Sequence, residues 1–239
     1  MAKKYFKKYT GKSESIIKAM QSIGEKDTSL DYRKKIGKLN NIDGVGTAKG
    51  NLKMLDLLKA GKLIKSLTGK DKFIYHMNII HDYMKAHGDK FFYSFTSAQK
   101  TFEKAKEKVK AGKKTGTTCV VPTRWGMAEV GIDPSGFYVK DGKFTKFTDE
   151  MKKFLTKITS GAVIGKTVKQ AVDKGLLQMG DILAFEGHTH TVSYTGKGYL
   201  MYDGGSAAEK RGYENVGIIL DYSVVDKNYK ISGILRWKE

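Results

Sequence analysis

Cysteine, proline and long apolar segments are scarce in this chain. Its 239 residues include one cysteine, Cys119, which excludes an intrachain disulfide, and two prolines, which argues against extended proline-rich disorder. No run of about 18 apolar residues occurs, so a transmembrane helix is not expected. The N-terminus reads Met-Ala-Lys-Lys-Tyr-Phe-Lys-Lys and lacks the apolar core of a secretory signal peptide. If the protein acts outside the cytoplasm, we expect another route to release it.

Acidic residues are also few, with 25 Asp and Glu against 44 Lys and Arg, and the formal net charge is +19. Such a charge attracts polyanions: nucleic acid, an anionic membrane, or a cell wall that carries teichoic acids. The sequence holds no recognisable nucleic-acid-binding motif. Residues 1–70 are the most basic part, with 17 Lys and Arg against 6 Asp and Glu. Charge alone does not choose among these partners.

The first 65 residues predict three short helices, each with a capping residue. Ser13 or Ser15 precedes an apolar stripe that Gly24 ends, and Ser29 precedes a second stripe. Thr47 begins the third helix, in which Leu52, Leu55 and Leu58 form one face. No set of titratable side chains occurs here, so we interpret residues 1–65 as a small three-helix bundle that binds a partner. The alternative is a subdomain packed on the rest of the chain.

The remainder predicts helices followed by antiparallel strands, which is an α+β domain. Residues 66–72 are expected to be a linker and residues 73–239 the second domain. The expected helices are residues 73–86 and 96–110. The expected strands are 181–185, 188–195, 199–203, 216–220 and 229–237. Alternation in residues 188–195 places His188, His190, Val192 and Tyr194 on one face, with the threonines and Ser193 on the other. In the last strand it places Tyr229, Ile231, Leu235 and Trp237 on one face.

Cys119 stands near the start of a predicted helix. Pro122 is tolerated only in the first turn of a helix, and Thr117 or Thr118 can cap that turn. At a helix N-terminus the unpaired N–H groups and the helix dipole favour a thiolate. The same groups can bind an oxyanion. Cys119 is therefore a candidate nucleophile, and the alternative is a buried cysteine of a core helix.

A histidine base and an orienting carboxylate are predicted from one hairpin. If Gly196 and Lys197 form a two-residue turn, Thr195 pairs with Gly198 and His190 lies opposite Asp203. Two other interpretations of this segment stay open. His188 and His190 could be ordinary strand residues, or His188, His190 and Asp203 could hold a metal ion. His76 and His81 lack the helical zinc spacing and are interpreted as surface or core residues.

These residues resemble a known family. Cysteine at a helix start, Gly-Asp-Ile-Leu-Ala-Phe at 180–185 and His-Thr-Val-Ser-Tyr-Thr-Gly-Lys-Gly at 190–198 are similar to NlpC-type and CHAP-type papain-like hydrolases of bacterial cell walls. The usual Asp-Cys-Ser of that family is Thr118-Cys119-Val120 here, and the third catalytic position is not fixed by a motif. The resemblance covers about residues 73–205 and implies cleavage of peptide-stem amide bonds without a metal or other cofactor.

The N-terminal part also carries a resemblance. Ser-Ile-Ile-Lys-Ala-Met at 15–20, Tyr-Arg-Lys-Lys-Ile at 32–36 and Gly-Thr-Ala-Lys-Gly-Asn-Leu-Lys-Met-Leu at 46–55 resemble cell-wall-binding modules of clostridial and phage endolysins. Together the two resemblances imply an endolysin with a papain-like catalytic domain. Cys119, His190 and Asp203 would be its catalytic residues, and it would act on peptidoglycan and anionic wall polymers after release through a holin pore. The rivals are a Cys/His acyltransferase on the same fold, a metal-dependent hydrolase and a non-catalytic basic wall-binding protein.

Overall fold

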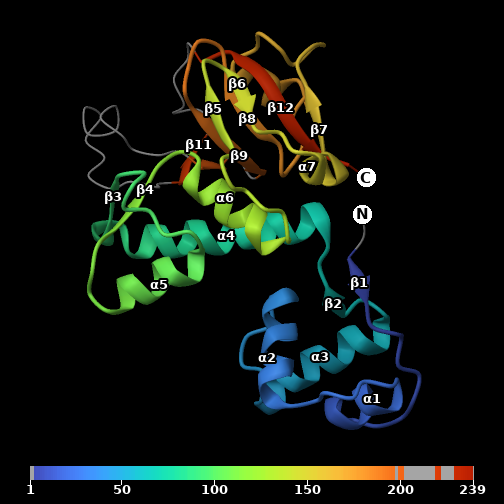
Figure 1. Ribbon diagram of the computed structural model, residues 1–239. Helices are drawn as coiled ribbons and strands as arrows, with labels where there is room; N and C mark the ends of the chain where they lie inside the picture. The colour runs from blue at the N-terminus through green and yellow to red at the C-terminus, as the bar shows by residue number, and fades with distance from the viewer. Residues whose placement is uncertain (1–2, 197–198, 202–218, 222–228, 239) are drawn as a thin grey trace. The chain divides into compact units, whose positions relative to one another are not determined.

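The computed structural model describes residues 3–196, 199–201, 219–221 and 229–238 and is of mixed α and β structure (Figure 1). The chain divides into two compact units, Met1–Thr68 and Gly69–Glu239. The residues expected to form a linker, 66–72, are mostly in regular structure. Ser66 ends a strand and the first helix of the second unit begins at Gly69, which leaves Leu67 and Thr68 between them.

The first unit holds the three predicted helices and a short pair of strands. Its elements are β1 (Lys4–Tyr5), α1 (Ile16–Ser22), α2 (Leu30–Leu39), α3 (Ala48–Ala60) and β2 (Ile64–Ser66). The predicted capping residues are confirmed: the side chains of Ser15, Ser29 and Thr47 accept hydrogen bonds from the first turns of α1, α2 and α3. Gly61 ends α3 in the left-handed conformation, which glycine adopts without strain.

The core of the first unit lies between the helices and the chain that leads into and out of the strands. Its buried apolar side chains are Phe6, Tyr9, Ile16, Ala19, Met20, Ile36, Ile42, Met54, Leu55, Leu58 and Leu63. One part of the predicted stripe is wrong, because Leu52 is 56% exposed and Met54 is buried in its place. Met54 and Leu58 are four residues apart and share a face with Leu55, so the buried face is turned away from Leu52.

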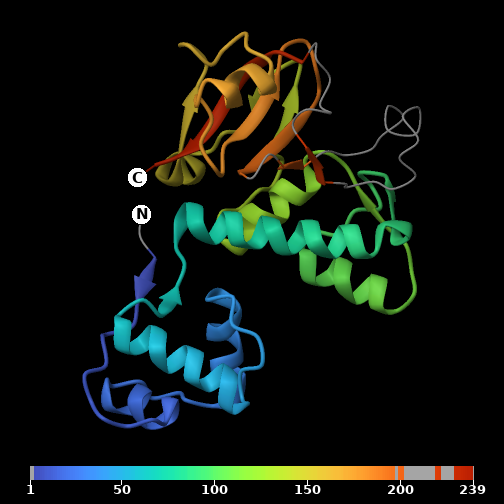
Figure 2. The ribbon, with the colours of Figure 1, turned by 180° about the vertical axis from the view of Figure 1, so that it is seen from behind.

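The second unit combines helices with a sheet. Its helices are α4 (Gly69–Ala86), α5 (Phe102–Lys110), α6 (Val121–Glu129), α7 (Asp149–Phe154) and α8 (Val168–Asp173). Two strand pairs stand apart from the main sheet: β3 (Phe91–Tyr93) with β4 (Thr115–Thr117), and β5 (Tyr138–Lys140) with β6 (Lys143–Thr145). The two views show α4, α5 and α6 together on one side of the main sheet (Figures 1 and 2).

The main sheet has the strand order β11-β10-β9-β8-β12-β7 and its neighbours are antiparallel. The strands are β7 (Leu155–Ile158), β8 (Ile182–Phe185), β9 (Thr191–Gly196), β10 (Tyr199–Met201), β11 (Ile219–Asp221) and β12 (Ile231–Trp237). Four of the five predicted strand segments hold a strand that begins within three residues of the expected start, and the fifth, 216–220, lies partly outside the described residues. The α+β class is confirmed.

The two faces of the sheet bury different side chains because strand residues alternate. Ile182 and Ala184 of β8 belong to the core that contains α4, α5 and α6. Leu183 and Phe185 belong to a second core on the other face, which includes Val192 of β9 and residues of α8. A side chain of β8 or β9 therefore packs in the first or the second core according to the face of the sheet from which it projects.

The prediction that Ile231, Leu235 and Trp237 share a face is wrong. Ile231 lies in the second core, whereas Leu235 and Trp237 lie in the core with the helices. The pairing of β12 with β8 is irregular between Ile231 and Gly233. An irregularity of one residue exchanges the faces beyond it, which simple alternation does not anticipate.

Among the described residues, no helix has both the length and the apolar character that crossing a lipid bilayer demands.

Candidate active site

Cys119 lies just ahead of α6, in the turn that joins β4 to that helix. It is half-buried, and Val120 is the N-cap residue. The prediction of a threonine cap is wrong: Val120 makes no side-chain capping bond, and Thr117 is the last residue of β4. Pro122 occupies the first turn of the helix as predicted. The thiol therefore stands at a helix N-terminus that no side chain closes.

Arg124 is the charged neighbour of this thiol. Its backbone N–H donates to the carbonyl oxygen of Val120 at 2.9 Å, and its Nε donates to that of Phe137 at 2.6 Å. Its guanidinium carbon lies 4.9 Å from the ring centre of Phe95. Burial lowers the pKa of Arg124, and the Cys119 thiolate opposes that shift. Each charge therefore lies within electrostatic reach of the other, as an activated cysteine requires.

A buried hydrogen bond ties the cysteine helix to the histidine strand. The hydroxyls of Thr123 and Ser193 are 2.8 Å apart, and both side chains are fully buried. Thr123 is four residues after Cys119, and Ser193 is three residues after His190. The bond therefore links α6 to β9 at a fixed register.

The direction of α6 along β9 follows from a chain of contacts. Gly126, late in α6, packs so closely on Phe73 that an added Cβ would lie 2.8 Å from its ring. The ring of Phe73 is 5.1 Å from that of Trp237, whose Nε1 donates to the carbonyl oxygen of Gly180 at 3.1 Å. The N–H of Gly180 donates in turn to the carbonyl oxygen of Tyr194 at 2.7 Å. The later part of α6 thus lies toward the later part of β9, so the two elements run in the same direction.

The residues that precede these two elements consequently lie toward the same end of the sheet. Cys119 precedes Thr123 by about 6 Å of helix, at about 1.5 Å per residue. His190 precedes Ser193 by about 10 Å of strand, at about 3.3 Å per residue. Both predicted catalytic residues therefore lie on the same side of the Thr123–Ser193 bond.

The imidazole of His190 itself lies against aromatic rings. Its centre is 5.8 Å from that of Phe185 in a stacked arrangement and 5.7 Å from that of Tyr229. Ser193 contacts α6, whereas His190, by alternation, faces the second core with Phe185 and Val192. The predicted alternation of residues 188–195 is confirmed. Both residues lie toward the same end of the sheet.

Both histidines of the segment are held by Tyr229. The ring centre of His188 lies 4.1 Å from that of Tyr229. Burial, together with the nearby His188, lowers the pKa of His190 to about 4. At neutral pH the His190 imidazole is therefore uncharged and able to accept a proton.

Asp203, the predicted orienting carboxylate, lies outside the described residues. The hairpin register on which it was predicted is wrong in the described part. Tyr199 pairs with Gly196 and Leu200 with Tyr194, and the register shifts between these two pairs. The assumed turn at Gly196 and Lys197 would have paired Thr195 with Gly198. Here Gly196 still belongs to β9, and an irregular pairing displaces every position beyond it.

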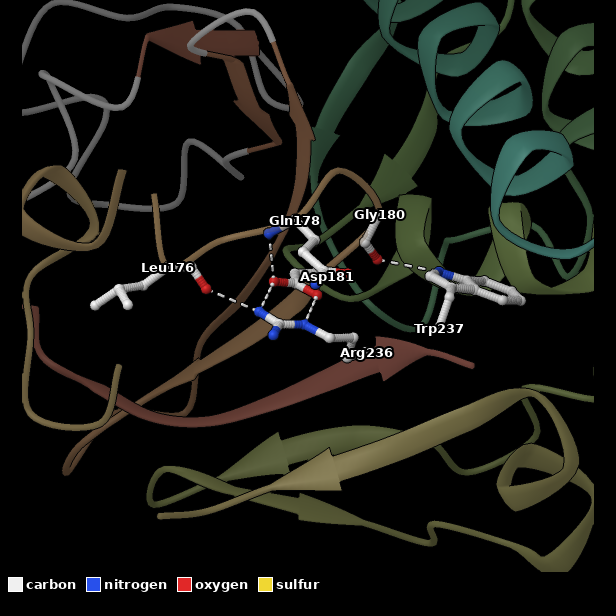
Figure 3. A network of polar contacts seen from close by, with 6 residues as sticks. All are labelled: Leu176, Gln178, Gly180, Asp181, Arg236 and Trp237. Atoms are coloured by element: carbon white, nitrogen blue, oxygen red, sulfur yellow. Dashed lines mark hydrogen bonds and ion pairs between the residues drawn. The ribbon is translucent and has the colours of Figure 1, made fainter. Parts of the chain in front are cut away.

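The Gly180–Asp181 pair of the sequence motif has a structural function (Figure 3). Arg236 of β12 donates to both carboxylate oxygens of the fully buried Asp181, at 2.9 and 2.7 Å, and also to the carbonyl oxygen of Leu176. The backbone N–H of Gln178 donates to Asp181 at 2.8 Å. Gly180 has a φ of 91°, and an added Cβ would lie 2.9 Å from the ring of Trp237. The motif therefore positions the start of β8.

Three further polar side chains near the site are buried. The hydroxyls of Thr117 and Thr118 are buried and, within the described ranges, have no hydrogen-bond partner. His81 is fully buried on α4, one turn beyond Met77 on the face that packs on α6. Its neighbours Met77 and Met84 gave the signal, since residue 81 falls on the same helical stripe.

Buried histidines predict acid sensitivity. The pKa of His190 is lowered to about 4 and that of His81 to about 3, both chiefly by burial. Below pH 6.5 the unfolded chain binds protons that the folded chain rejects, so stability is complete above pH 6.5 and falls as pH decreases. Each group contributes a slope of about 1.4 kcal/mol per pH unit. Urea unfolding between pH 7 and 5 measures this slope. His81→Gln should reduce it by about half, and equal unfolding free energies at pH 7 and 5 would contradict the prediction.

No cluster of three or more His, Cys, Asp or Glu residues with metal-binding geometry occurs within the described ranges. The metal site considered from the sequence also needs Asp203, which those ranges do not include.

Comparison of the chain with family models, with curated proteins and with solved structures yields no match.

Proposed function

We propose that this protein is a peptidoglycan hydrolase that cleaves an amide bond of the wall peptide with Cys119 as nucleophile and His190 as base. The observation that carries the proposal is the buried Thr123–Ser193 bond. It joins the helix that follows the cysteine to the strand that follows the histidine. A helix bearing cysteine at its start, packed on an antiparallel sheet bearing histidine, is the arrangement that a papain-like hydrolase requires.

In this mechanism the Cys119 thiol gives its proton to the uncharged imidazole of His190 as the sulfur attacks the carbonyl carbon of the scissile amide. Backbone N–H groups at the start of α6 stabilise the oxyanion. The C–N bond breaks as the imidazolium of His190 protonates the departing amine, which leaves a thioester on Cys119. His190 then takes a proton from water as the water attacks the thioester, and it returns this proton to the departing sulfur. This releases the carboxylic acid and restores the thiol. Asp203 would orient the imidazole. Catalytic hydrogen bonds are often long in unliganded enzymes and tighten when the substrate is bound.

The first unit would hold the enzyme on the wall. Its three capped helices form a separate core, and its surface carries most of the excess positive charge of residues 1–70. Peptidoglycan-linked polyanions are the matching partner, and the protein would reach them after release from the cytoplasm. As a bundle without a set of titratable residues, this unit contributes binding and leaves catalysis to residues 69–239.

Turbidity of a purified wall suspension tests the proposal, with mass spectrometry of the released fragments. We expect clearing and new amino and carboxyl ends at one amide bond, either between muramate and alanine or within the peptide. A thiol alkylator should stop the reaction and EDTA should not. Clearing that EDTA abolishes would favour the metal-dependent alternative, and wall binding without new ends would favour a non-catalytic wall-binding protein.

Wall binding should weaken with salt. The full-length Cys119→Ser protein should sediment with walls at low ionic strength and be released as NaCl rises to about 0.5 M, because salt screens exposed charges beyond about 10 Å at 0.1 M. A sedimentation titration measures the loss, with walls stripped of teichoic acids as the control. Binding that is constant in salt and unchanged by stripping would contradict an electrostatic contribution.

A further inference from the structure

A cavity of about 480 Å³ lies along the exposed side of α6. It is bounded by α6, by the segment that leads into α5, and by the loop after α6. The residues that form it are Phe95, Ala98, Gln99, Lys100, Thr101, Val121, Arg124, Trp125, Ala128, Asp133, Pro134, Ser135 and Gly136. Val121 and Arg124 place one wall of the cavity directly after the turn that holds Cys119. The cavity therefore adjoins the proposed nucleophile.

Arg124 is the half-buried cation of this cavity. Its Nε is used by the carbonyl oxygen of Phe137, and its planar face rests on Phe95. No described acidic side chain forms an ion pair with it, and its two terminal nitrogens make no hydrogen bond to described residues. The other described arginines differ: Arg236 pairs with Asp181 and Arg33 with Asn51. Arg124 thus keeps a fork of donors that fits a carboxylate.

The other charged side chains of the cavity do not neutralise the guanidinium of Arg124. Lys100 is exposed and adds positive charge. Asp133 is exposed, and its carboxylate already accepts a hydrogen bond from the N–H of Ser135 at 2.9 Å. An anionic group of a ligand would therefore meet a guanidinium that is already oriented by Phe95 and Phe137, so little side-chain entropy is lost on binding.

We propose that Arg124 binds a carboxylate of the wall peptide close to the scissile amide, and that the cavity beside α6 is the subsite for the residue that carries it. This inference rests on the proposed hydrolase function. Two carboxylates of a wall peptide have the required chemistry. One is the α-carboxylate that a glutamate linked through its γ-carboxyl leaves free, and the other is the carboxylate at the C-terminus of the peptide. Amidation of either removes the charge with almost no change of shape.

Synthetic wall peptides in three forms test the subsite: with both carboxylates free, with the glutamate α-amide, and with the C-terminal amide. The wild-type protein should cleave the free form with a kcat/KM about 10- to 100-fold higher than one of the two amides, the range expected for a hydrogen bond to a charged group. The amide that is disfavoured identifies the carboxylate. Equal kcat/KM for all three forms would overturn the proposal.

Variants separate recognition from activation of the thiol. Arg124→Gln should bring the ratio of free to amidated substrate to about one, and Arg124→Lys should retain part of it as a point charge. A change in the reactivity of Cys119 alters kcat/KM of both substrates alike and cancels in this ratio. Lys110→Gln, at an exposed position of α5 that does not line the cavity, is the matched control and should leave the ratio unchanged. A ratio that survives in Arg124→Gln would assign the preference to another residue and overturn the proposal.

Binding distinguishes failure of this inference from failure of the hydrolase function. Trp125 lines the cavity, so fluorescence of the full-length Cys119→Ser protein reports titration with the free and amidated peptides. If the wild type cleaves none of the peptides, carboxylate-dependent binding that Arg124→Gln abolishes would still support the subsite. Cleavage without preference, together with equal binding of all three peptides, would overturn the subsite and leave the hydrolase function standing.

Discussion

Cys119→Ser should abolish wall lysis while leaving the fold and wall binding intact. A serine hydroxyl is a far weaker acid and nucleophile than a thiol, and Cys119 lies within electrostatic reach of Arg124 at a helix N-terminus. Loss of a nucleophile typically lowers the rate by at least about a thousandfold. Turbidity assays at equal protein concentration, with circular dichroism as the folding control, measure the effect. Activity within tenfold of the wild type would exclude cysteine catalysis.

The histidines provide the matched series for this prediction. His190→Gln should be as damaging as Cys119→Ser, because the base is needed in both half-reactions. His188→Gln should be milder, since its ring rests on Tyr229 without a step in the mechanism. His81→Gln tests the other buried imidazole, on the helix face that packs on α6. If His81→Gln or His188→Gln proves the inactive variant while His190→Gln lyses walls, the base has been assigned to the wrong histidine.

Arg236→Met should cause the largest loss of stability. It removes the partner of Asp181, whose carboxylate is 1% exposed and otherwise bonded to the N–H of Gln178. Breaking a buried ion pair from one side leaves an uncompensated charge and typically costs about 3 to 5 kcal/mol. Urea unfolding measures the change in the free energy of unfolding.

The exposed pair of Lys152 and Asp149, 2.8 Å apart, supplies the control for this prediction. Lys152→Met should leave the unfolding free energy almost unchanged, because solvent screens exposed pairs. A small effect of Arg236→Met, similar to that of Lys152→Met, would contradict the structural function assigned to the Gly-Asp motif.

Local features of the sequence predicted the helices of the first unit well. Ser15, Ser29 and Thr47 cap their helices because each bonds only to N–H groups two or three residues ahead. The same reasoning failed near Cys119. Thr117 is the last residue of β4, and Val120 is the N-cap residue of α6. Pairing with β3, which lies more than twenty residues earlier in the chain, decided that outcome.

Alternation predicted which residues of β9 face together, and the contacts of His190, Val192 and Ser193 agree. It did not predict the pairing with β10 or the exchanged faces of β12, because both depend on irregular pairing. Such an irregularity arises from the pairing of two strands, so the alternation of apolar residues within one strand does not predict it. For the same reason the place of Asp203 could not follow from counting along the hairpin.

By itself the sequence determined the α+β class, the caps of α1, α2 and α3, and the choice of Cys119 and His190 as candidates, because these depend on spacing along one segment. Only the tertiary structure decided that α6 lies along β9 in the same direction and that Asp181 pairs with Arg236, 55 residues later. It also decided that Arg124 faces a cavity without an acidic partner among the described residues. These are contacts between segments that are far apart in the sequence, and they depend on how the apolar faces of helices and strands pack in the folded protein.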